Sequence, residues 1–319
     1  MRGLLVPVVV EWPWPGDAMT PPAAASASVP ASPSRQAIPS LLAGLIDDAA
    51  LFPPGNAPVE EAVPEHAWHA RAWYAPLVGP FLLPVTRFSE VAAAAVAAQQ
   101  SGDLDGPLPV TAVCRSAADV SAAVDAARGA GSLRLVAIEA AGGPEERVDD
   151  VVAVLRRVIT ADLRAFAEVS WQAATWPAAL DTLQQTPYSV KLRTGGTVRG
   201  AFPDEQTVAA YLVACAERNL PLKCTAGLHS AMRHRDPSTG FEHHGFLNVL
   251  LAAATAAGGA TLPTVREVLA ERHEHVLVAN AQALDTTAAS RARRLFTSYG
   301  SCSIAEPLSD LVRLGLLDR

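Results

Sequence analysis

The stretch LRAFAEVSWQAATWPAALDTLQQTPYSVKLRT, residues 163–194, places a helical pattern between two short runs rich in β-branched and aromatic residues. The runs occupy 163–171 and 188–194, and the apolar residues of 175–185 recur at helical spacing. A strand, a helix and a second strand at this spacing form one βα unit and the beginning of the next. The stretch therefore predicts two parallel strands connected by a helix.

The same alternation of β-rich runs and Ala-rich helical stretches continues along the chain from about residue 80. Further β-rich runs occupy residues 79–86, 108–114, 133–140 and 220–226. Six successive βα units imply a parallel sheet, either a closed (β/α)₈ barrel or an open doubly wound sheet. The dinucleotide fingerprint GxGxxG and the phosphate loop GxxxxGK[ST] are absent from the sequence.

Polar residues at the ends of the β-rich runs distinguish the two architectures. The C-terminal ends of four runs carry Glu139, Glu168, Lys191 with Arg193, and Lys223. In a barrel these ends meet around one mouth, whereas in an open sheet they lie along an edge. We therefore predict an α/β fold, a (β/α)₈ TIM-type barrel, as a single domain over residues 39–319.

Two segments are candidates for the remaining strands of this barrel. They are EHVLVAN, residues 274–280, and RLFTSYGSCS, residues 294–303. The second is favoured because the helical pattern AEPLSDLVRLGLL follows it, as in the preceding βα units.

Composition limits the partners and the compartment. The chain has 319 residues, half of them apolar, and a net charge of −7. No basic patch interleaved with aromatics is evident, so no nucleic-acid partner is expected, and the apolar runs are shorter than a membrane span. Four scattered cysteines without a CxxC pair indicate a reducing, cytoplasmic setting. The sequence leaves the oligomeric state open, a homo-oligomer included.

The first 38 residues are excluded from the predicted domain. Residues 16–39 are rich in Pro, Ala and Ser, a composition typical of disordered segments. The apolar run before them is interrupted by Glu11, Trp12 and prolines, unlike the core of a signal peptide. We predict a disordered N-terminal extension over residues 1–38.

The scarcity of lysine suggests that the two lysines have a chemical role. Of the 25 lysine and arginine residues only two are lysine, Lys191 and Lys223, and they lie on consecutive predicted strands. Arg supplies a positive charge equally well, but only an amine can lose its proton and attack a carbonyl. A nearby ammonium lowers the pKa of its partner, so the pair predicts a neutral amine. The residues leave open which lysine is the nucleophile. The alternative is a pair of cations that balance Glu139 and Glu168.

Glycine-rich strand ends predict an anion site. The residues concerned lie in three loops, and they are Thr194, Gly195, Gly196, Thr225, Gly227, Gly300, Ser301 and Ser303. Glycine lets backbone N–H groups approach an anion, and a helix N-terminus adds its dipole. Together with Arg193, these residues are the predicted binding site for a phosphate or carboxylate. Ordinary turn glycines and a Ser N-cap are the alternative.

The order of these features resembles a known family. One strand ends in K-x-x-T-G, a later strand ends in K-x-x-A-G, and a Gly/Ser loop precedes a helix. This order is similar to that of class I aldolases of the deoxyribose-phosphate aldolase type, over residues 163–227 and, loosely, 295–304. The resemblance implies that Lys191 forms the Schiff base, that Lys223 tunes it and that the loops hold a substrate phosphate. The closing residues 298–317 also resemble the end of an uncharacterised bacterial barrel family, which implies no function.

A His-rich segment follows the second lysine and should form a long loop over the barrel mouth. The segment, GLHSAMRHRDPSTGFEHHGFLN at 227–248, contains His229, His234, His243 and His244. His229 is a candidate general acid or base. His234 reads as an exposed residue of a surface loop.

Two adjacent carboxylates, Asp47 and Asp48, lie in LIDDAALFPPGNAPVEEA at 45–62. One interpretation is a helix-capping or helix-end pair. The other is a segment that covers one end of the barrel with an Asp reaching the site. In the latter case histidines of the loop could bind a metal together with Asp47 or Asp48. The spacing matches no metal motif such as HExxH, so no cofactor is expected.

These observations support three hypotheses. The first is a lysine-dependent, Schiff-base aldolase or lyase acting on a small carbonyl compound that is an anion, such as a sugar phosphate. Lys191 forms the imine, Lys223 lowers its pKa, and Glu168, His229 or Asp47 moves protons. A carboxylate beside Lys191 would oppose the fall in pKa, so Glu168 is expected to contact the substrate or Lys223 instead.

The other two hypotheses keep the fold but change the chemistry. One is a metal-dependent lyase, isomerase or hydrolase whose ligands are Asp47, Asp48, His229, His243 and His244. The other is a barrel without catalytic activity that binds a phosphorylated metabolite.

Overall fold

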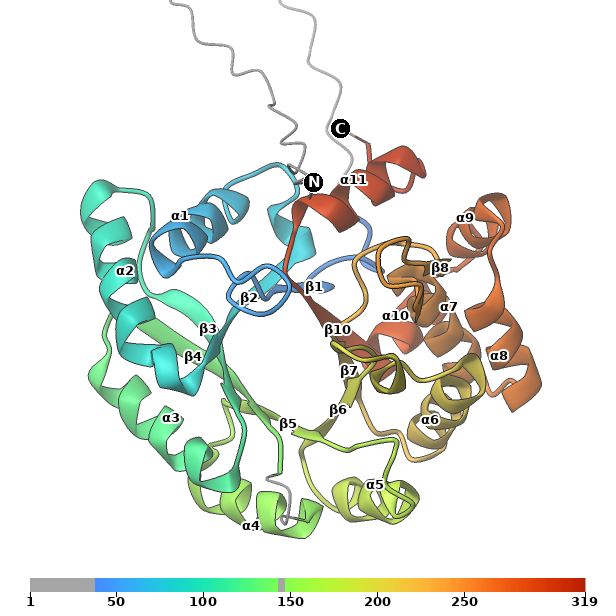
Figure 1. Cartoon of the computed structure of the whole chain (residues 1–319), viewed down its shortest axis with the longest axis horizontal. Coiled ribbons are helices and arrows are strands. Elements are labelled where there is room, and N and C mark those ends of the chain that lie inside the picture. The colour runs from blue at the N-terminus through green and yellow to red at the C-terminus, as the bar shows by residue number, and fades with distance from the viewer. Residues whose placement is uncertain (1–37, 143–146, 319) are drawn as a thin grey trace, which may run out of the picture. The chain divides into compact units, whose positions relative to one another are not determined.

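Eight parallel strands close into a barrel in the computed structural model, which describes residues 38–142 and 147–318 (Figure 1). The strands are β1 (Ile46–Asp48), β2 (Val78–Pro84), β3 (Leu108–Cys114), β4 (Leu133–Ala140), β5 (Arg164–Glu168), β6 (Ser189–Arg193), β7 (Leu222–Thr225) and β10 (Phe296–Ser301). Each strand pairs with its neighbours around the ring, and β1 closes it between β10 and β2. The prediction of a (β/α)₈ TIM-type barrel is confirmed.

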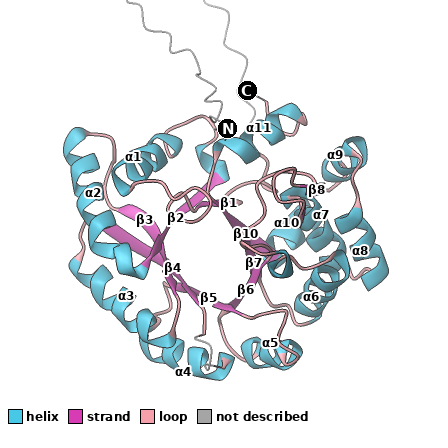
Figure 2. Ribbon diagram, in the orientation of Figure 1, coloured by secondary structure: helices cyan, strands magenta, loops and turns pink. Residues whose placement is uncertain are grey.

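Helices surround the strands on the outside of the barrel (Figure 2). They are α1 (Val59–His69), α2 (Phe88–Ser101), α3 (Ala117–Gly129), α4 (Val148–Val158), α5 (Trp176–Gln184), α6 (Glu205–Glu217), α7 (Phe246–Ala257), α8 (Leu262–Ala270), α9 (Glu274–Gln282), α10 (Thr286–Leu295) and α11 (Ala305–Arg313). Short 3-10 turns occupy Ala75–Leu77, Val85–Arg87 and Arg199–Ala201. A small antiparallel hairpin, β8 (His234–Arg235) and β9 (Glu242–His243), lies within the His-rich segment.

The last strand is placed correctly by the sequence, but the candidate strand at 274–280 is wrong. Residues 294–303 contain β10, whereas 274–280 lie in α9. Within α9 only Leu277 is fully buried, so the segment has one inward residue rather than the alternating buried face of a strand. Its β-branched residues give a local preference for a strand, but the tertiary contacts of the segment favour a short helix instead.

The remaining strand is β1, which the sequence patterns do not predict. It has three residues, too few to show an alternating pattern, and it is fixed by pairing with β10 and β2. Asp47 and Asp48 lie inside it, so the helix-capping interpretation of this pair is wrong. The loop that follows, with Phe52, Pro53 and Pro54, lines a cavity at the mouth, as the alternative interpretation expects of a covering segment.

Strand alternation explains why both lysines lie inside the barrel. Val190 and Leu192 of β6 and Leu222 and Cys224 of β7 are fully buried among the hydrophobic residues packed outside the strands. Successive side chains of a strand point to opposite faces. The residue between each apolar pair, Lys191 or Lys223, therefore points into the barrel.

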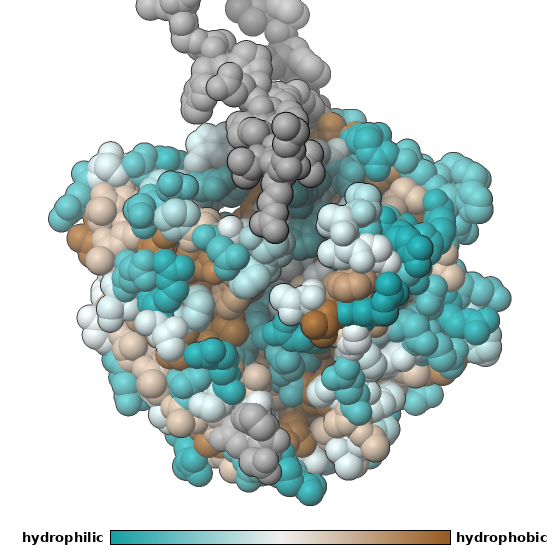
Figure 3. All heavy atoms as spheres, viewed as in Figure 1, coloured by the Kyte–Doolittle hydropathy of each residue, from teal (hydrophilic) through white to brown (hydrophobic). Residues whose placement is uncertain are grey.

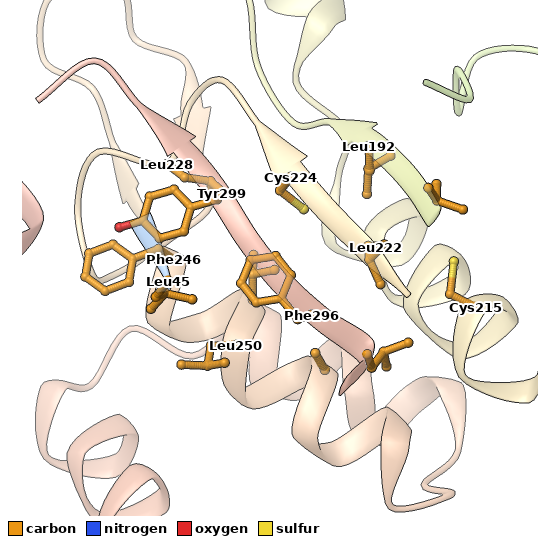
Figure 4. Packing of buried hydrophobic residues seen from close by; sticks show 14 of the residues in the cluster. Leu45, Leu192, Cys215, Leu222, Cys224, Leu228, Phe246, Leu250, Phe296 and Tyr299 are labelled. Atoms are coloured by element: carbon orange, nitrogen blue, oxygen red, sulfur yellow. The ribbon is translucent and has the colours of Figure 1, made fainter. Parts of the chain in front are cut away.

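The helix layer is held to the barrel by close aromatic and aliphatic packing (Figure 4). Tyr299 of β10 stacks on Phe246 of α7 with ring centroids 5.3 Å apart and an interplanar angle of 16°. Such a pair contributes roughly 0.5–1.5 kcal/mol beyond its area burial. This contact fixes α7 against β10, the strand that contains Gly300 at the mouth.

Several sequence predictions concern the chain as a whole. The disordered extension expected over residues 1–38 falls outside the described residues, apart from residue 38. Among the helices that the structure describes, none combines the length and apolar character needed to cross a membrane. The cysteines Cys114, Cys215, Cys224 and Cys302 are free thiols.

The loops after β6 and β7 approach each other closely. A substitution at this contact tests the packing near the mouth. A Cβ at Gly195 would lie 2.9 Å from the backbone N and Cα of Gly227, which are unable to move aside independently. Gly195→Ala should therefore lower the free energy of unfolding by about 1–3 kcal/mol through overpacking. The control is Gly129→Ala, where no atom lies within 4 Å and the change should stay within about 0.5 kcal/mol. Equal urea midpoints for the two variants would contradict this assignment.

Candidate functional site

Six ionisable side chains of alternating sign form one chain inside the barrel, and in order they are Asp47, Lys223, Glu139, Lys191, Glu168 and Arg193. The ammonium of Lys191 lies 2.8 Å from Glu139 Oε2 and 3.1 Å from Glu168 Oε2. The ammonium of Lys223 pairs with Asp47 Oδ2 and with the other oxygen of Glu139. Arg193 Nε completes the chain 3.4 Å from Glu168 Oε1.

This chain confirms that the two lysines lie on adjacent strands inside the barrel. Lys191 and Lys223 are register partners in β6 and β7, and their exposed fractions are 2% and 1%. One carboxylate, that of Glu139 from β4, contacts both ammonium groups. Three carboxylates balance three cations, so the buried charges are compensated, as the low-dielectric interior requires.

The pairing reverses the predicted pKa shift of the lysines. Burial acts to lower the pKa of Lys191, but attraction to Glu139 and Glu168 outweighs it, so the pKa is raised. The pKa of Lys223 is raised in the same way, with Asp47 and Glu139 outweighing burial. The prediction of a neutral amine at rest is therefore wrong, because carboxylates rather than the second ammonium are the direct neighbours.

Two related expectations are corrected by the same contacts. Glu168 was expected to avoid Lys191, yet it is one of the two partners of that amine. Burial acts to raise the pKa of Glu139, but the ammonium groups of Lys191 and Lys223 outweigh it and lower the pKa to about 2. Glu139 is therefore ionised at neutral pH.

Of the two adjacent aspartates, only Asp47 takes part in the chain of ion pairs. Asp47 also accepts a hydrogen bond of 2.8 Å from Ser298 Oγ on β10. Asp48 points to the other face of β1, where its Oδ2 lies 2.9 Å from His66 Nδ1 on α1. The opposite orientations follow from strand alternation. Asp48 therefore supports helix packing and does not reach the lysines.

Above the charged chain, a cavity of about 1280 Å³ opens at the C-terminal ends of the strands. Its lining includes Glu139 and Lys191, together with the predicted residues Arg193, Gly195, Gly196, Thr225, Gly227, His229, His243 and Gly300. Figure 3 shows that hydrophilic and hydrophobic residues are interspersed on this face of the molecule. Lys223, Asp47 and Glu168 are not in the lining, so Lys191 is the amine that a ligand can reach.

Three predicted binding residues, all outside this lining, direct their hydroxyl groups to the backbone. Thr194 Oγ1 donates to the carbonyl of Ala226 at 2.7 Å, and Ser301 Oγ donates to that of Ser303 at 2.7 Å. Ser303 Oγ accepts a hydrogen bond of 3.2 Å from the Glu306 N–H in the first turn of α11. These contacts shape the loops at the mouth and match the alternative interpretation of turns and a Ser cap.

The five residues of the predicted metal site are not brought together. His229 and His243 line the cavity, but Asp48 is bound to His66. His244 is buried, with Nε2 donating to the Pro203 carbonyl at 2.8 Å and Nδ1 lying 3.2 Å from Arg233. Burial lowers the pKa of His244 to about 4. In the part of the chain that the structure describes, no group of three His, Cys, Asp or Glu residues could hold a metal ion.

Two residues of the site are missing from the sequence prediction, and a third, Glu139, entered it only as a carboxylate that the lysines balance in the alternative interpretation. The observed ion pairs match that alternative, and the place of Glu139 between outward-facing Ile138 and Ala140 points it inward. Cys302 and Glu306 lie beside His229 in the cavity lining. No spacing in the sequence links these two residues to His229, because the contacts join distant loops.

Comparisons with known proteins add no assignment to this geometry. Neither protein-family models nor curated proteins match the sequence. The function is therefore argued from the site itself.

Denaturation measurements can test how much the shared carboxylate of Glu139 contributes to the free energy of unfolding. Glu139→Gln should lower the free energy of unfolding by about 3–5 kcal/mol, because it leaves buried ammonium groups without a shared partner. The control is Glu90→Gln, which breaks the surface pair with Arg87 at 2.7 Å and should change stability by less than about 1 kcal/mol. Urea denaturation at pH 7 measures both, and similar losses would show that the buried chain is not a major source of stability.

Proposed function

We propose that this barrel is a lysine-dependent aldolase or lyase that forms a Schiff base between Lys191 and a small carbonyl compound with an anionic group. One observation carries the proposal: Lys191 lies in the cavity lining with two carboxylates, Glu139 and Glu168, within 3.1 Å of its ammonium nitrogen. This arrangement supplies a nucleophile and proton acceptors at one point. The resemblance to class I aldolases, carried by K-x-x-T-G at Lys191 and K-x-x-A-G at Lys223, agrees with it.

The choice of Lys191 over Lys223 rests on access. Lys223 lies between Asp47 and Glu139 and is not in the cavity lining, whereas Lys191 is, although both side chains are nearly buried, at 1% and 3% exposed. A substrate carbonyl that enters through the mouth meets Lys191 first. Lys223 then acts as a fixed cation that keeps Glu139 ionised, rather than as a group that depresses the pKa of Lys191.

Imine formation requires the ammonium of Lys191 to lose a proton. Glu168 is the better acceptor, because its side chain is 19% exposed, whereas that of Glu139 is 1% exposed and has the ammonium of Lys223 on its other oxygen. The neutral nitrogen attacks the carbonyl carbon, and the carbonyl oxygen leaves as water after protonation. The resulting iminium accepts the electron pair of a neighbouring C–C bond when that bond breaks.

A cation at the rim of the cavity is available to bind the anionic group of the substrate. Arg193 lines the cavity with its side chain 49% exposed, and the guanidinium geometry suits phosphate and carboxylate. Gly195 and Gly196 after β6 and Gly227 after β7 line the cavity beside it. We therefore favour a phosphorylated or carboxylated aldehyde or ketone as the substrate.

Borohydride trapping tests the imine directly. Protein incubated with phosphorylated aldehydes and keto acids, then reduced with borohydride, should carry a stable adduct on the Lys191 peptide in mass spectrometry. Lys191→Arg should abolish the adduct, and circular dichroism should confirm that this variant is folded. An adduct on Lys223, or none with any carbonyl compound, would contradict the assignment.

The pH dependence of trapping provides an independent test. Because the pKa of Lys191 is raised above its ordinary value of 10.5, the neutral fraction of the amine grows with every step toward alkaline pH. The rate of imine formation, sampled by rapid quenching, should rise about tenfold per pH unit between pH 7 and 9. Glu168→Gln should shift this profile to lower pH by removing one carboxylate from the amine. A plateau near neutrality in the unaltered protein would contradict a raised pKa.

The raised pKa of both lysines also favours a second candidate, non-covalent binding of an anionic metabolite. In that case the ammonium of Lys191 contributes only charge and hydrogen bonds. Inorganic phosphate should then raise the melting temperature by mass action, while no carbonyl compound is trapped. Trapping on Lys191 distinguishes the enzyme from such a binding protein.

A further inference from the structure

A thiol, an imidazole and a carboxylate meet on one wall of the cavity, apart from the chain of charges around Lys191. Cys302 follows β10, His229 follows β7, and Glu306 lies in the first turn of α11. The sulfur of Cys302 lies 3.7 Å from Nδ1 and 3.9 Å from Nε2 of His229. Nδ1 of His229 also lies 3.2 Å from Glu306 Oε2. All three residues line the cavity.

The loops that hold this cluster approach each other closely. A Cβ at Gly55, in the loop after β1, would lie 3.0 Å from Cβ of Cys302 and 3.3 Å from its carbonyl oxygen. The glycine therefore lets this loop pack against Cys302. The sulfur is almost equally distant from the two ring nitrogens of His229, and the Glu306 carboxylate lies on the Nδ1 side.

The imidazole of His229 contributes a charge to this wall. Hydrogen bonds with Cys302 and with Glu306 raise the pKa of His229 to about 10, so the imidazole is a cation at neutral pH. A cationic imidazole beside a thiol favours the thiolate, which is the nucleophilic form of cysteine. Other titratable groups in the lining of this cavity are Asp310 from α11, the hairpin residues His234, Asp236 and His243, and the strand residues Glu139, Lys191 and Arg193.

The other cysteines provide an internal contrast. Cys114, Cys215 and Cys224 are buried, and burial raises the pKa of each thiol. Cys302 is partly exposed and lines the cavity. The described structure thus pairs one accessible thiol with a histidine and encloses the rest.

We propose that Cys302 is a nucleophilic thiolate, paired with His229 and oriented through it by Glu306, that adds reversibly to a small aldehyde in the cavity. In this step the sulfur forms a bond to the carbonyl carbon. The π electron pair moves to the oxygen, which takes the proton from the imidazolium, and the product is a hemithioacetal. The choice of an aldehyde rests on the proposed function, whereas the reactive thiolate does not involve Lys191.

Alkylation with iodoacetamide at pH 6 and pH 9 tests the thiolate. For an ordinary thiol the rate changes roughly 200-fold between these values, following the thiolate fraction. For Cys302 the change should be less than tenfold, with the label located by mass spectrometry of peptides. The three buried cysteines should stay unlabelled until the protein is unfolded.

Matched variants identify the partner of the thiol. His229→Gln should slow alkylation at pH 6 at least tenfold and restore the steep pH dependence. Glu306→Gln should slow it only two- to threefold, because this carboxylate is 60% exposed and acts through His229. His234→Gln, a histidine of the same cavity that hydrogen-bonds the Met232 carbonyl, should leave the rate unchanged.

Two outcomes would overturn the thiolate pair. One is a 200-fold pH dependence in the unaltered protein, which needs no variant to be measured. The other is an equal effect of His229→Gln and His234→Gln, with circular dichroism showing both folded. Labelling of the buried cysteines at the rate of Cys302 would likewise contradict the contrast between them.

The aldehyde step is tested separately in Lys191→Arg protein, in which no imine can form at Lys191. Glyceraldehyde should slow the alkylation of Cys302, and dilution should restore the rate, whereas glycerol at the same concentration should have no effect. Lack of protection, or equal protection by glycerol, would overturn the hemithioacetal. Neither outcome affects borohydride trapping on Lys191 in the unaltered protein, so the two proposals fail independently.

Discussion

The carboxylate of Glu139, held between two buried ammonium groups, is the interaction on which the interior of this barrel depends. A buried cation is tolerated only when an opposite charge compensates its lost hydration. Lys191 and Lys223 share Glu139, and Glu168 and Asp47 complete the pairing at either end. Five different strands contribute, so the barrel must close in the correct register before all charges are paired. Even Gly79 of β2 belongs to this constraint, because a Cβ there would collide with the Asp47 carboxylate.

The repeated βα pattern made the fold predictable from the sequence, and two exceptions show the limit of such patterns. β1 has three residues, and its adjacent aspartates look like a helix cap until pairing with β10 and β2 makes them a strand. Residues 274–280 have the composition of a strand, yet they form a helix that buries only Leu277 completely. Both depend on tertiary partners that a local window of sequence does not contain.

Strand alternation explains which side chains enter the barrel, but it does not determine which partners they meet there. Lys191 and Lys223 lie inside because apolar neighbours flank each of them. The direction of their pKa shift depends on whether a carboxylate or an ammonium is nearest, and Glu139 comes from a distant strand. The hydroxyl of Thr194 is a similar case, since its orientation toward the Ala226 carbonyl depends on the packing of two loops.

The charge balance at the floor of the cavity has a consequence for recognition. Because three carboxylates neutralise three cations in the buried chain, the floor has little net attraction for an anion. Recognition of an anion must then rely on hydrogen bonds at the rim. The half-exposed guanidinium of Arg193, at the end of β6, lines the cavity and faces Glu168 through its Nε. An anionic carbonyl compound held there would have its charged group at the rim and its carbonyl carbon directed down toward Lys191.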